Sequence, residues 1–180
     1  MKKYFILVLL PLIFGCNNSN SLDMKNVTWK TLTGIKMNPE KTLVKTTTTA
    51  WDNNYAISNN FLSKKRNGRA SLILGDATSA RFFGLQVGDQ FNSFKTIDYT
   101  FYITSNNRLG IWENAKPQGE YFKYAISDTL TISKHKSNIL YKLNNKTLKV
   151  SALKDTTKLL HVVASIHKEG VVMNPVKCNF

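Results

Sequence analysis

The chain has 180 residues, a formal net charge of +14 and a hydrophobic fraction of 42%. This length favours a single domain that can bury a substantial core. The hydrophobic fraction is ordinary for a globular protein and excludes a largely disordered chain.

The N-terminal segment is typical of a secretory signal. Two lysines precede an uncharged run, Tyr4–Gly15, which ends directly before Cys16. The run is too short for a transmembrane helix, which needs about 20 apolar residues. The segment resembles the signal of bacterial lipoproteins, in which a small residue followed by cysteine marks the cleavage point. We expect a signal over 1–15, lipidation of Cys16 and a polar tether over 16–26. The alternative is a buried N-terminal helix with an unrelated cysteine.

Cleavage before Cys16 would leave 165 residues with a formal charge of +12. The lipid would make the membrane the first partner of this protein. We expect the protein to be located in the bacterial cell envelope, at the outer membrane. An exported chain meets little nucleic acid, so we expect no nucleic-acid partner. The charge, which includes the cluster Lys64-Lys65-Arg66, then indicates a solubilising surface, with anionic polysaccharide or lipid headgroups as the next candidates. With Cys16 lipidated, Cys178 has no disulfide partner, and we expect a packed or idle thiol and not a catalytic one.

Short runs rich in β-branched and aromatic residues alternate with turn residues from Val27 onward, which is the pattern of strands. The expected strands are Val27–Leu32, Leu43–Thr47, Tyr55–Phe61, Arg69–Leu74, Ala80–Gln86, Thr96–Thr104, Leu109–Glu113, Thr129–Lys134, Ile139–Leu143, Lys146–Ser151, Leu159–Ser165 and Val171–Val176. Asn144-Asn145 predicts a two-residue hairpin turn. Many short strands without long amphipathic helices predict an all-β antiparallel β-sandwich or barrel over 27–180.

Alternation within two of these strands assigns side chains to faces. One face should line the core between the sheets and carries Tyr99, Phe101, Ile103, Leu109 and Ile111. The opposite face carries Asp98, Thr100, Tyr102 and Trp112. We therefore expect Tyr102 and Trp112 to be half-exposed on an outer sheet surface.

An ordered series of segments runs through the domain. It comprises Val27-Thr28-Trp29, Thr42-Leu43-Val44-Lys45-Thr46, Ala50-Trp51-Asp52-Asn53, Arg81-Phe82-Phe83-Gly84-Leu85, Asp98-Tyr99-Thr100-Phe101-Tyr102-Ile103, Ile111-Trp112-Glu113-Asn114, Asp128-Thr129-Leu130, Tyr141-Lys142-Leu143-Asn144-Asn145-Lys146 and Val162-Val163-Ala164-Ser165. The series resembles small concanavalin A-like lectin/glucanase domains, which occur in exported bacterial proteins beside adhesive or carbohydrate-active modules. The resemblance covers about residues 27–176 and implies a jelly-roll sandwich. The long basic stretch Phe61–Gly75 departs from it.

Enzymes of this fold hydrolyse or eliminate polysaccharides, and hydrolysis needs two carboxylates that flank the scissile bond. Glu113 and Glu120 only flank a turn, and no Glu-x-Asp-x-Glu pattern is present. Tyr121-Phe122-Lys123 faintly resembles one motif of jelly-roll alginate lyases, but the companion motifs are absent. The three histidines lack metal-ligand spacing, and no Asp-rich loop suggests calcium. We expect no catalysis, metal or cofactor; a polysaccharide lyase or glycoside hydrolase of jelly-roll type is the alternative.

Sugar recognition uses aromatic faces for stacking and planar polar groups for hydroxyls. The candidate ligand-binding residues are Trp51, Tyr102 and Trp112, with Arg81, Asp98 and Asn114 as polar partners. Arg81 and Asp98 could instead form a structural ion pair, and Trp51 could be a packing residue. We expect a non-catalytic, lectin-like protein that binds a glycan or a cell-surface partner. The alternative is an accessory subunit of an outer-membrane protein complex without glycan binding.

Overall fold

The computed structural model describes residues 23–180 except 52, 77, 91–92 and 156. The expected signal and the lipidation site Cys16 lie outside the described residues. Within them the chain consists of strands and one short 3-10 helix, η1 (Phe94–Thr96). No helix in this part has the length and apolar character that a membrane crossing requires.

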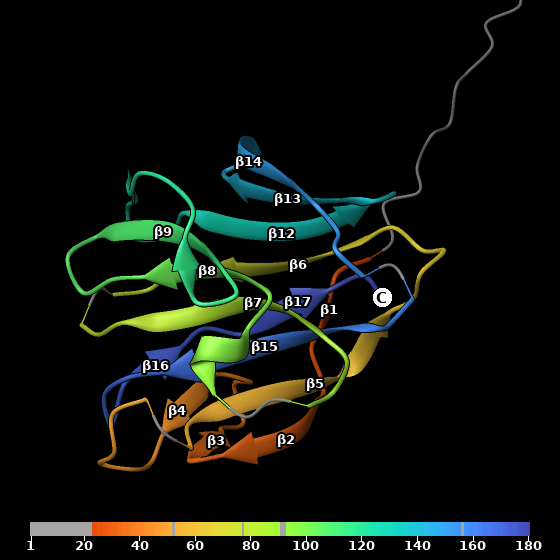
Figure 1. Cartoon of the computed structure of the whole chain (residues 1–180). Helices are drawn as coiled ribbons and strands as arrows, with labels where there is room; N and C mark the ends of the chain where they lie inside the picture. The colour runs from red at the N-terminus through yellow and green to blue at the C-terminus, as the bar shows by residue number, and fades with distance from the viewer. Residues whose placement is uncertain (1–22, 52, 77, 91–92, 156) are drawn as a thin grey trace, which may run out of the picture.

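Two large sheets form the layers of a sandwich, and all their strand pairings are antiparallel (Figure 1). The six-stranded sheet has the order β1 (Lys25–Asn26), β17 (Val176–Cys178), β6 (Gly68–Ile73), β12 (Thr129–His135), β13 (Asn138–Leu143) and β14 (Lys146–Ala152). The eight-stranded sheet has the order β10 (Lys116–Pro117), β9 (Arg108–Glu113), β8 (Tyr99–Ile103), β7 (Arg81–Val87), β15 (Leu160–Ile166), β5 (Tyr55–Leu62) and β2 (Trp29–Thr33), with β11 (Phe122–Lys123) paired to β9. A small third sheet contains β16 (Val172–Met173), β4 (Leu43–Lys45) and β3 (Ile35–Met37).

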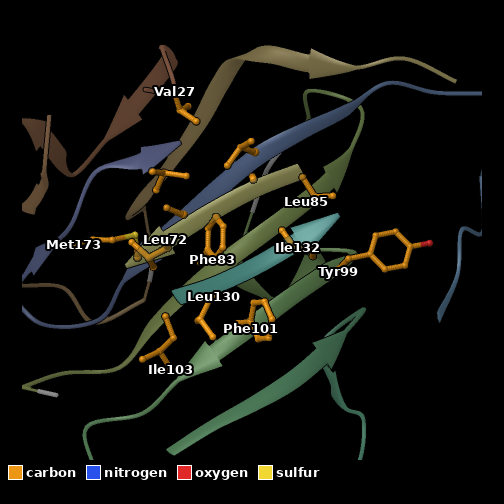
Figure 2. Close-up of a cluster of buried hydrophobic side chains, with 14 of the residues drawn as sticks. Val27, Leu72, Phe83, Leu85, Tyr99, Phe101, Ile103, Leu130, Ile132 and Met173 are labelled. Atoms are coloured by element: carbon orange, nitrogen blue, oxygen red, sulfur yellow. The ribbon is translucent and has the colours of Figure 1, made fainter. Parts of the chain in front are cut away.

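The main hydrophobic core lies between the two large sheets. Figure 2 shows Phe83 and Phe101 of the eight-stranded sheet beside Leu130 and Ile132 of the six-stranded sheet. All four side chains are fully buried. Removing such large apolar side chains from water supplies about 1.5–3 kcal/mol each, which stabilises the contact between the layers.

The predicted faces of β8 and β9 are confirmed. Phe101 is completely buried and Ile111 is 3% exposed, whereas Tyr102 and Trp112 are only partly buried on the other face. The predicted hairpin at Asn144-Asn145 is also confirmed, since it joins β13 to β14 and both of its residues have positive φ. Such φ angles are what a tight hairpin turn requires.

The strand predicted to begin at Val27 and end at Leu32 instead begins at Trp29 as β2, and a separate short strand, β1, precedes Val27. β1 pairs with β17 in one sheet and β2 pairs with β5 in the other, so the chain changes sheets around Val27. Val27 itself is 4% exposed and belongs to the core. The start of the strand predicted over Thr96–Thr104 was also wrong. The chain first forms η1, whose residue Lys95 donates its N–H to the Ser93 hydroxyl.

Candidate functional site

A partly exposed aromatic surface covers the outer face of the eight-stranded sheet. We call it the aromatic patch, and it consists of Trp51, Phe82, Phe94, Tyr102, Trp112 and Tyr121. Phe82 is buried beneath the others, which are each partly exposed. Three of the six come from sheet strands, and three come from the segments that flank the sheet.

The strand register builds the centre of the aromatic patch. Phe82 on β7 is directly opposite Tyr102 on β8, and their ring centroids are 4.8 Å apart in a stacked arrangement. Trp112 on β9 lies beside them, 5.2 Å from Tyr102 and 6.0 Å from Phe82. Burial raises the pKa of Tyr102, and the neighbouring Tyr121 raises it further. The Tyr102 hydroxyl is therefore a neutral hydrogen-bonding group at physiological pH.

Two glycines of this sheet allow close contacts that a Cβ atom would prevent. A Cβ at Gly84 would lie 2.0 Å from the carbonyl oxygen of Tyr99 and 2.7 Å from Cα of Thr100, so β7 and β8 could not keep their close approach. A Cβ at Gly110 would lie 3.0 Å from the ring of Tyr121. Glycine at this position thus lets the ring of Tyr121 pack closely against β9.

Tyr121 completes the edge of the aromatic patch. Its hydroxyl accepts the indole N–H of Trp112 across 3.2 Å. It follows the β10 segment and directly precedes β11, which pairs with β9. The guanidinium of Arg108 lies 6.0 Å from its ring centroid. The hydrogen bond favours one orientation of the Trp112 ring.

Trp51 reaches the aromatic patch from the loop between β4 and β5. Its ring lies 5.0 Å from Phe82 and 4.8 Å from His167. The base of this loop is held by Lys45, whose side chain is 1% exposed. The Lys45 ammonium donates to the carbonyl oxygens of Thr49, Ala50 and His167. Burial lowers the pKa of Lys45, and Glu169 opposes that shift.

Phe94 covers the other side of Phe82. The short helix η1 carries it across β7 and β15 (Figure 1). Its ring is stacked on Phe82 at 5.5 Å and lies 5.1 Å from Trp51. Trp51 and Phe94 thus pack against a small second hydrophobic cluster, whose buried residues are Ile57, Phe82, Ile97 and Val163.

The structure brings together the three aromatic candidates but not the three polar ones. Trp51, Tyr102 and Trp112 share the aromatic patch. Arg81 does not, because it lies on the core-facing side of β7 with Phe83 and is 3% exposed. Asn114 is exposed in the turn between β9 and β10, with a positive φ.

The ion pair considered for Arg81 and Asp98 was wrong. Arg81 binds Asp76 instead, with Nη2 2.8 Å from Oδ1 and Nη1 2.8 Å from the carbonyl oxygen. Asp98 accepts the side-chain amide of Gln86 and the backbone N–H of Val87, both at 2.8 Å. Arg81 is the first residue of β7, whereas Asp98 precedes β8 and contacts the last two residues of β7, which alternation within one strand could not reveal. Burial raises the pKa of Asp98, and the hydrogen bond from Val87 opposes this.

The two glutamates that the sequence offered as a carboxylate pair lie in different environments. Glu113 points between the sheets, is 9% exposed and accepts a 3.0 Å hydrogen bond from the Tyr141 hydroxyl. Glu120 is exposed. Among the described residues, no group of three or more His, Cys, Asp or Glu side chains is placed to hold a metal ion. Cys178 is a packed thiol as predicted, 1% exposed, and burial raises its pKa.

Sequence reasoning missed Phe82, Phe94 and Tyr121 as members of the aromatic patch. For Phe82 the signal was ambiguous, because Phe82-Phe83 places one phenylalanine on each face of the strand. Nothing in the local sequence links Phe94 or Tyr121 to Trp112. Only the covering helix and the pairing of β11 with β9 bring them there.

Solved structures similar to this chain share its fold. The carbohydrate recognition domain of Emp46p in its metal-free form matches with a TM-score of 0.58 at 11% identity, covering 84% of this chain and 87% of that chain. The PSpry domain of TRIM65 matches with a TM-score of 0.55 at 8% identity, covering 86% and 90%. Alginate lyase A1-II′, of polysaccharide lyase family 7, matches with a TM-score of 0.49 at 6% identity, covering 81% and 78%.

No protein-family model and no curated protein matches the sequence. The two similarities with TM-scores above 0.5, to the Emp46p and TRIM65 domains, are at low identity and show the fold alone. The predicted all-β antiparallel sandwich of the concanavalin A-like jelly-roll class is confirmed.

Proposed function

We propose that this protein is a non-catalytic, lectin-like module that binds a glycan through the aromatic patch. The observation that carries the proposal is the convergence of Trp51, Tyr102 and Trp112, from three separate segments, on one outer sheet face with their rings partly exposed. Aromatic rings beside fixed hydroxyl groups suit the apolar faces and hydroxyls of sugars. The fold shared with a carbohydrate recognition domain supports the same class of ligand.

The absence of catalysis belongs to this proposal. Glu113 is directed between the sheets, away from the aromatic patch, so it does not pair with the exposed Glu120 across a surface ligand. We also propose that a lipid on Cys16 holds the domain at the bacterial outer membrane. A tethered binding module needs no chemistry of its own, since it acts by keeping a glycan near the membrane surface.

Glycan-array binding of the full-length chain tests the proposal. We expect selected glycans to bind, and Trp112→Ala to reduce their affinity roughly tenfold, as loss of a central aromatic contact does at other interfaces. Phe61→Ala is the matched control, because Phe61 is an aromatic residue of the same sheet, 49% exposed and outside the aromatic patch. Cross-linking to an envelope protein complex without any glycan signal would support the accessory-subunit alternative instead.

A further inference from the structure

The outer face of the six-stranded sheet carries two adjoining hollows of about 330 and 570 Å³. They share Arg69, Thr131 and Asn145, so they form one continuous depression. Because the core lies between the two sheets, this face is on the opposite side of the sandwich from the aromatic patch. Among the described residues that line the depression, none is acidic and none is Phe, Tyr or Trp.

The strand register places a row of polar side chains across this face. Lys177 on β17 is opposite Ser71 on β6, Ser71 is opposite Thr131 on β12, and Thr131 is opposite Lys142 on β13. The hydroxyls of Ser71 and Thr131 are 2.9 Å apart and hydrogen-bonded. With neighbouring strands about 4.8 Å apart, the backbones of the two terminal lysines are separated by about 14 Å. A hydroxyl pair therefore lies between two cations across the depression.

Arg69 adds a third cation next to this row. It is exposed on β6, directly opposite Ser133 of β12. We call Arg69, Lys142 and Lys177 the basic strip. The ion pairs found in the described part of the chain involve other cations, so no carboxylate there neutralises the basic strip. Asp128 precedes β12, but its carboxylate binds the N–H of Ala125 at 2.7 Å and the amide of Asn144 at 2.6 Å.

The cluster Lys64-Lys65-Arg66 is fixed at one end of the same depression. Lys134, which is 3% exposed, donates to the carbonyl oxygens of Lys64 and Arg66, both at 2.8 Å. Lys136 donates its N–H to the side chain of Asn67 at 2.7 Å. The loop between β5 and β6 is thus attached to the end of β12, and its three exposed cations extend the positive surface.

We infer that this face binds an anionic polysaccharide, with the basic strip contacting its carboxylate or sulfate groups and the Ser71–Thr131 pair contacting its hydroxyls. Unpaired cations around hydroxyl and amide groups match a polymer that is both charged and rich in hydroxyls. A single-stranded nucleic acid would be expected to use large aromatic rings for base stacking, and the described lining of the depression contains no Phe, Tyr or Trp. The inference uses none of the aromatic patch and is independent of the function proposed above.

Calorimetric titration of the full-length chain, purified in detergent, tests this inference with four probes: polygalacturonate, dextran sulfate, neutral dextran and a single-stranded oligonucleotide. We expect the two anionic polysaccharides to bind, with neutral dextran and the oligonucleotide much weaker. Comparing the affinities for polygalacturonate and dextran sulfate shows whether the face prefers carboxylate or sulfate groups. The triple variant Arg69→Gln, Lys142→Gln, Lys177→Gln should lose roughly tenfold or more in affinity, from three contacts of modest strength each. The salt dependence of its binding should also become weaker.

A charge-matched control separates this site from the general positive charge. The triple variant Lys36→Gln, Lys41→Gln, Lys123→Gln removes three exposed lysines that lie outside the depression. It should bind the anionic polysaccharides like the unmodified chain. Equal losses in the two triple variants would overturn the inference. So would binding to the oligonucleotide without binding to either anionic polysaccharide.

Discussion

The indole N–H of Trp112 donates to the hydroxyl of Tyr121 across 3.2 Å, and the ring of Tyr121 lies over Gly110. This contact joins β9 to the segment before β11 and orients an aromatic ring at the sheet surface. A buried or half-buried indole N–H needs a partner, so Tyr121 stabilises the orientation of Trp112.

Gly110→Ala should disturb this arrangement directly. The new methyl group would lie 3.0 Å from the Tyr121 ring and 3.3 Å from Nε1 of Trp112, so the tyrosine must move. We expect a loss of about 1–3 kcal/mol in the free energy of unfolding and a several-fold loss in glycan affinity. Urea unfolding and calorimetry measure the two effects. Tyr121→Phe, which removes only the hydroxyl, should have smaller effects; an unchanged affinity in Gly110→Ala would contradict the role given to Tyr121.

The hydrogen bond from Tyr141 to Glu113 crosses the core from one sheet to the other. Tyr141→Phe would leave the buried carboxylate without this donor, and we expect a loss of about 1–3 kcal/mol in the free energy of unfolding. Glu113→Gln keeps an acceptor and should cost less. Combining the two changes in a double-mutant cycle measured by urea unfolding should give a clear coupling energy. Additive effects would show that the contact does not join the sheets energetically.

Tyr141 also predicts a pH dependence. Burial, and then the charge of Glu113, raise the pKa of Tyr141 above its usual value. The unfolded chain therefore releases this proton first, at about pH 10. The contribution of Tyr141 to the free energy of unfolding is constant below that pH, and the free energy of unfolding falls as the pH rises above it. Urea unfolding between pH 8 and 11 should show a shallower decline in Tyr141→Phe; an identical slope would contradict this assignment.

Two buried lysines allow the role of Trp51 to be tested with a matched control. Lys45 binds carbonyl oxygens of the loop that carries Trp51, whereas Lys134 binds those of the β5–β6 loop. Replacing either by methionine keeps much of the volume and removes the ammonium, so each variant should lose about 1–3 kcal/mol of stability. Only Lys45→Met should also weaken glycan binding. Equal glycan affinities in the two variants would show that the position of Trp51 is unimportant.

The alternation of residues in β8 and β9 was sufficient to predict the most useful part of the site. Tyr102 and Trp112 had to lie opposite Phe101 and Ile111, because side chains in a strand alternate between faces. The same reasoning does not place Arg81. Its neighbours Phe82 and Phe83 are both buried, one on each side of the sheet, so the local pattern does not say which side is the core.

Long-range relationships were beyond the reach of local patterns. Trp51 lies in a loop, and its position depends on an ammonium group whose partners include the carbonyl oxygen of His167. The row from Lys177 to Lys142 exists only because β17, near the C-terminus, pairs with β6. Sequence periodicity specified the strands and their faces, but strand order determined which side chains meet.

The lipid anchor stays a prediction from sequence. Cys16→Ala should prevent lipidation, and the protein should then move from the membrane fraction to the soluble fraction. Fractionation with labelled palmitate incorporation measures both effects. A Cys16→Ala protein that still sediments entirely with membranes would contradict the proposed anchor.

The affinity of single tryptophan variants for a glycan selected on the array tests the central claim most directly. Trp51 comes from a loop and Trp112 from β9, yet both belong to the aromatic patch. The account predicts that Trp51→Ala and Trp112→Ala each lower the affinity roughly tenfold, while Phe61→Ala leaves it unchanged. Unchanged affinity in both tryptophan variants, or an equal loss in Phe61→Ala, would contradict a binding site at the aromatic patch.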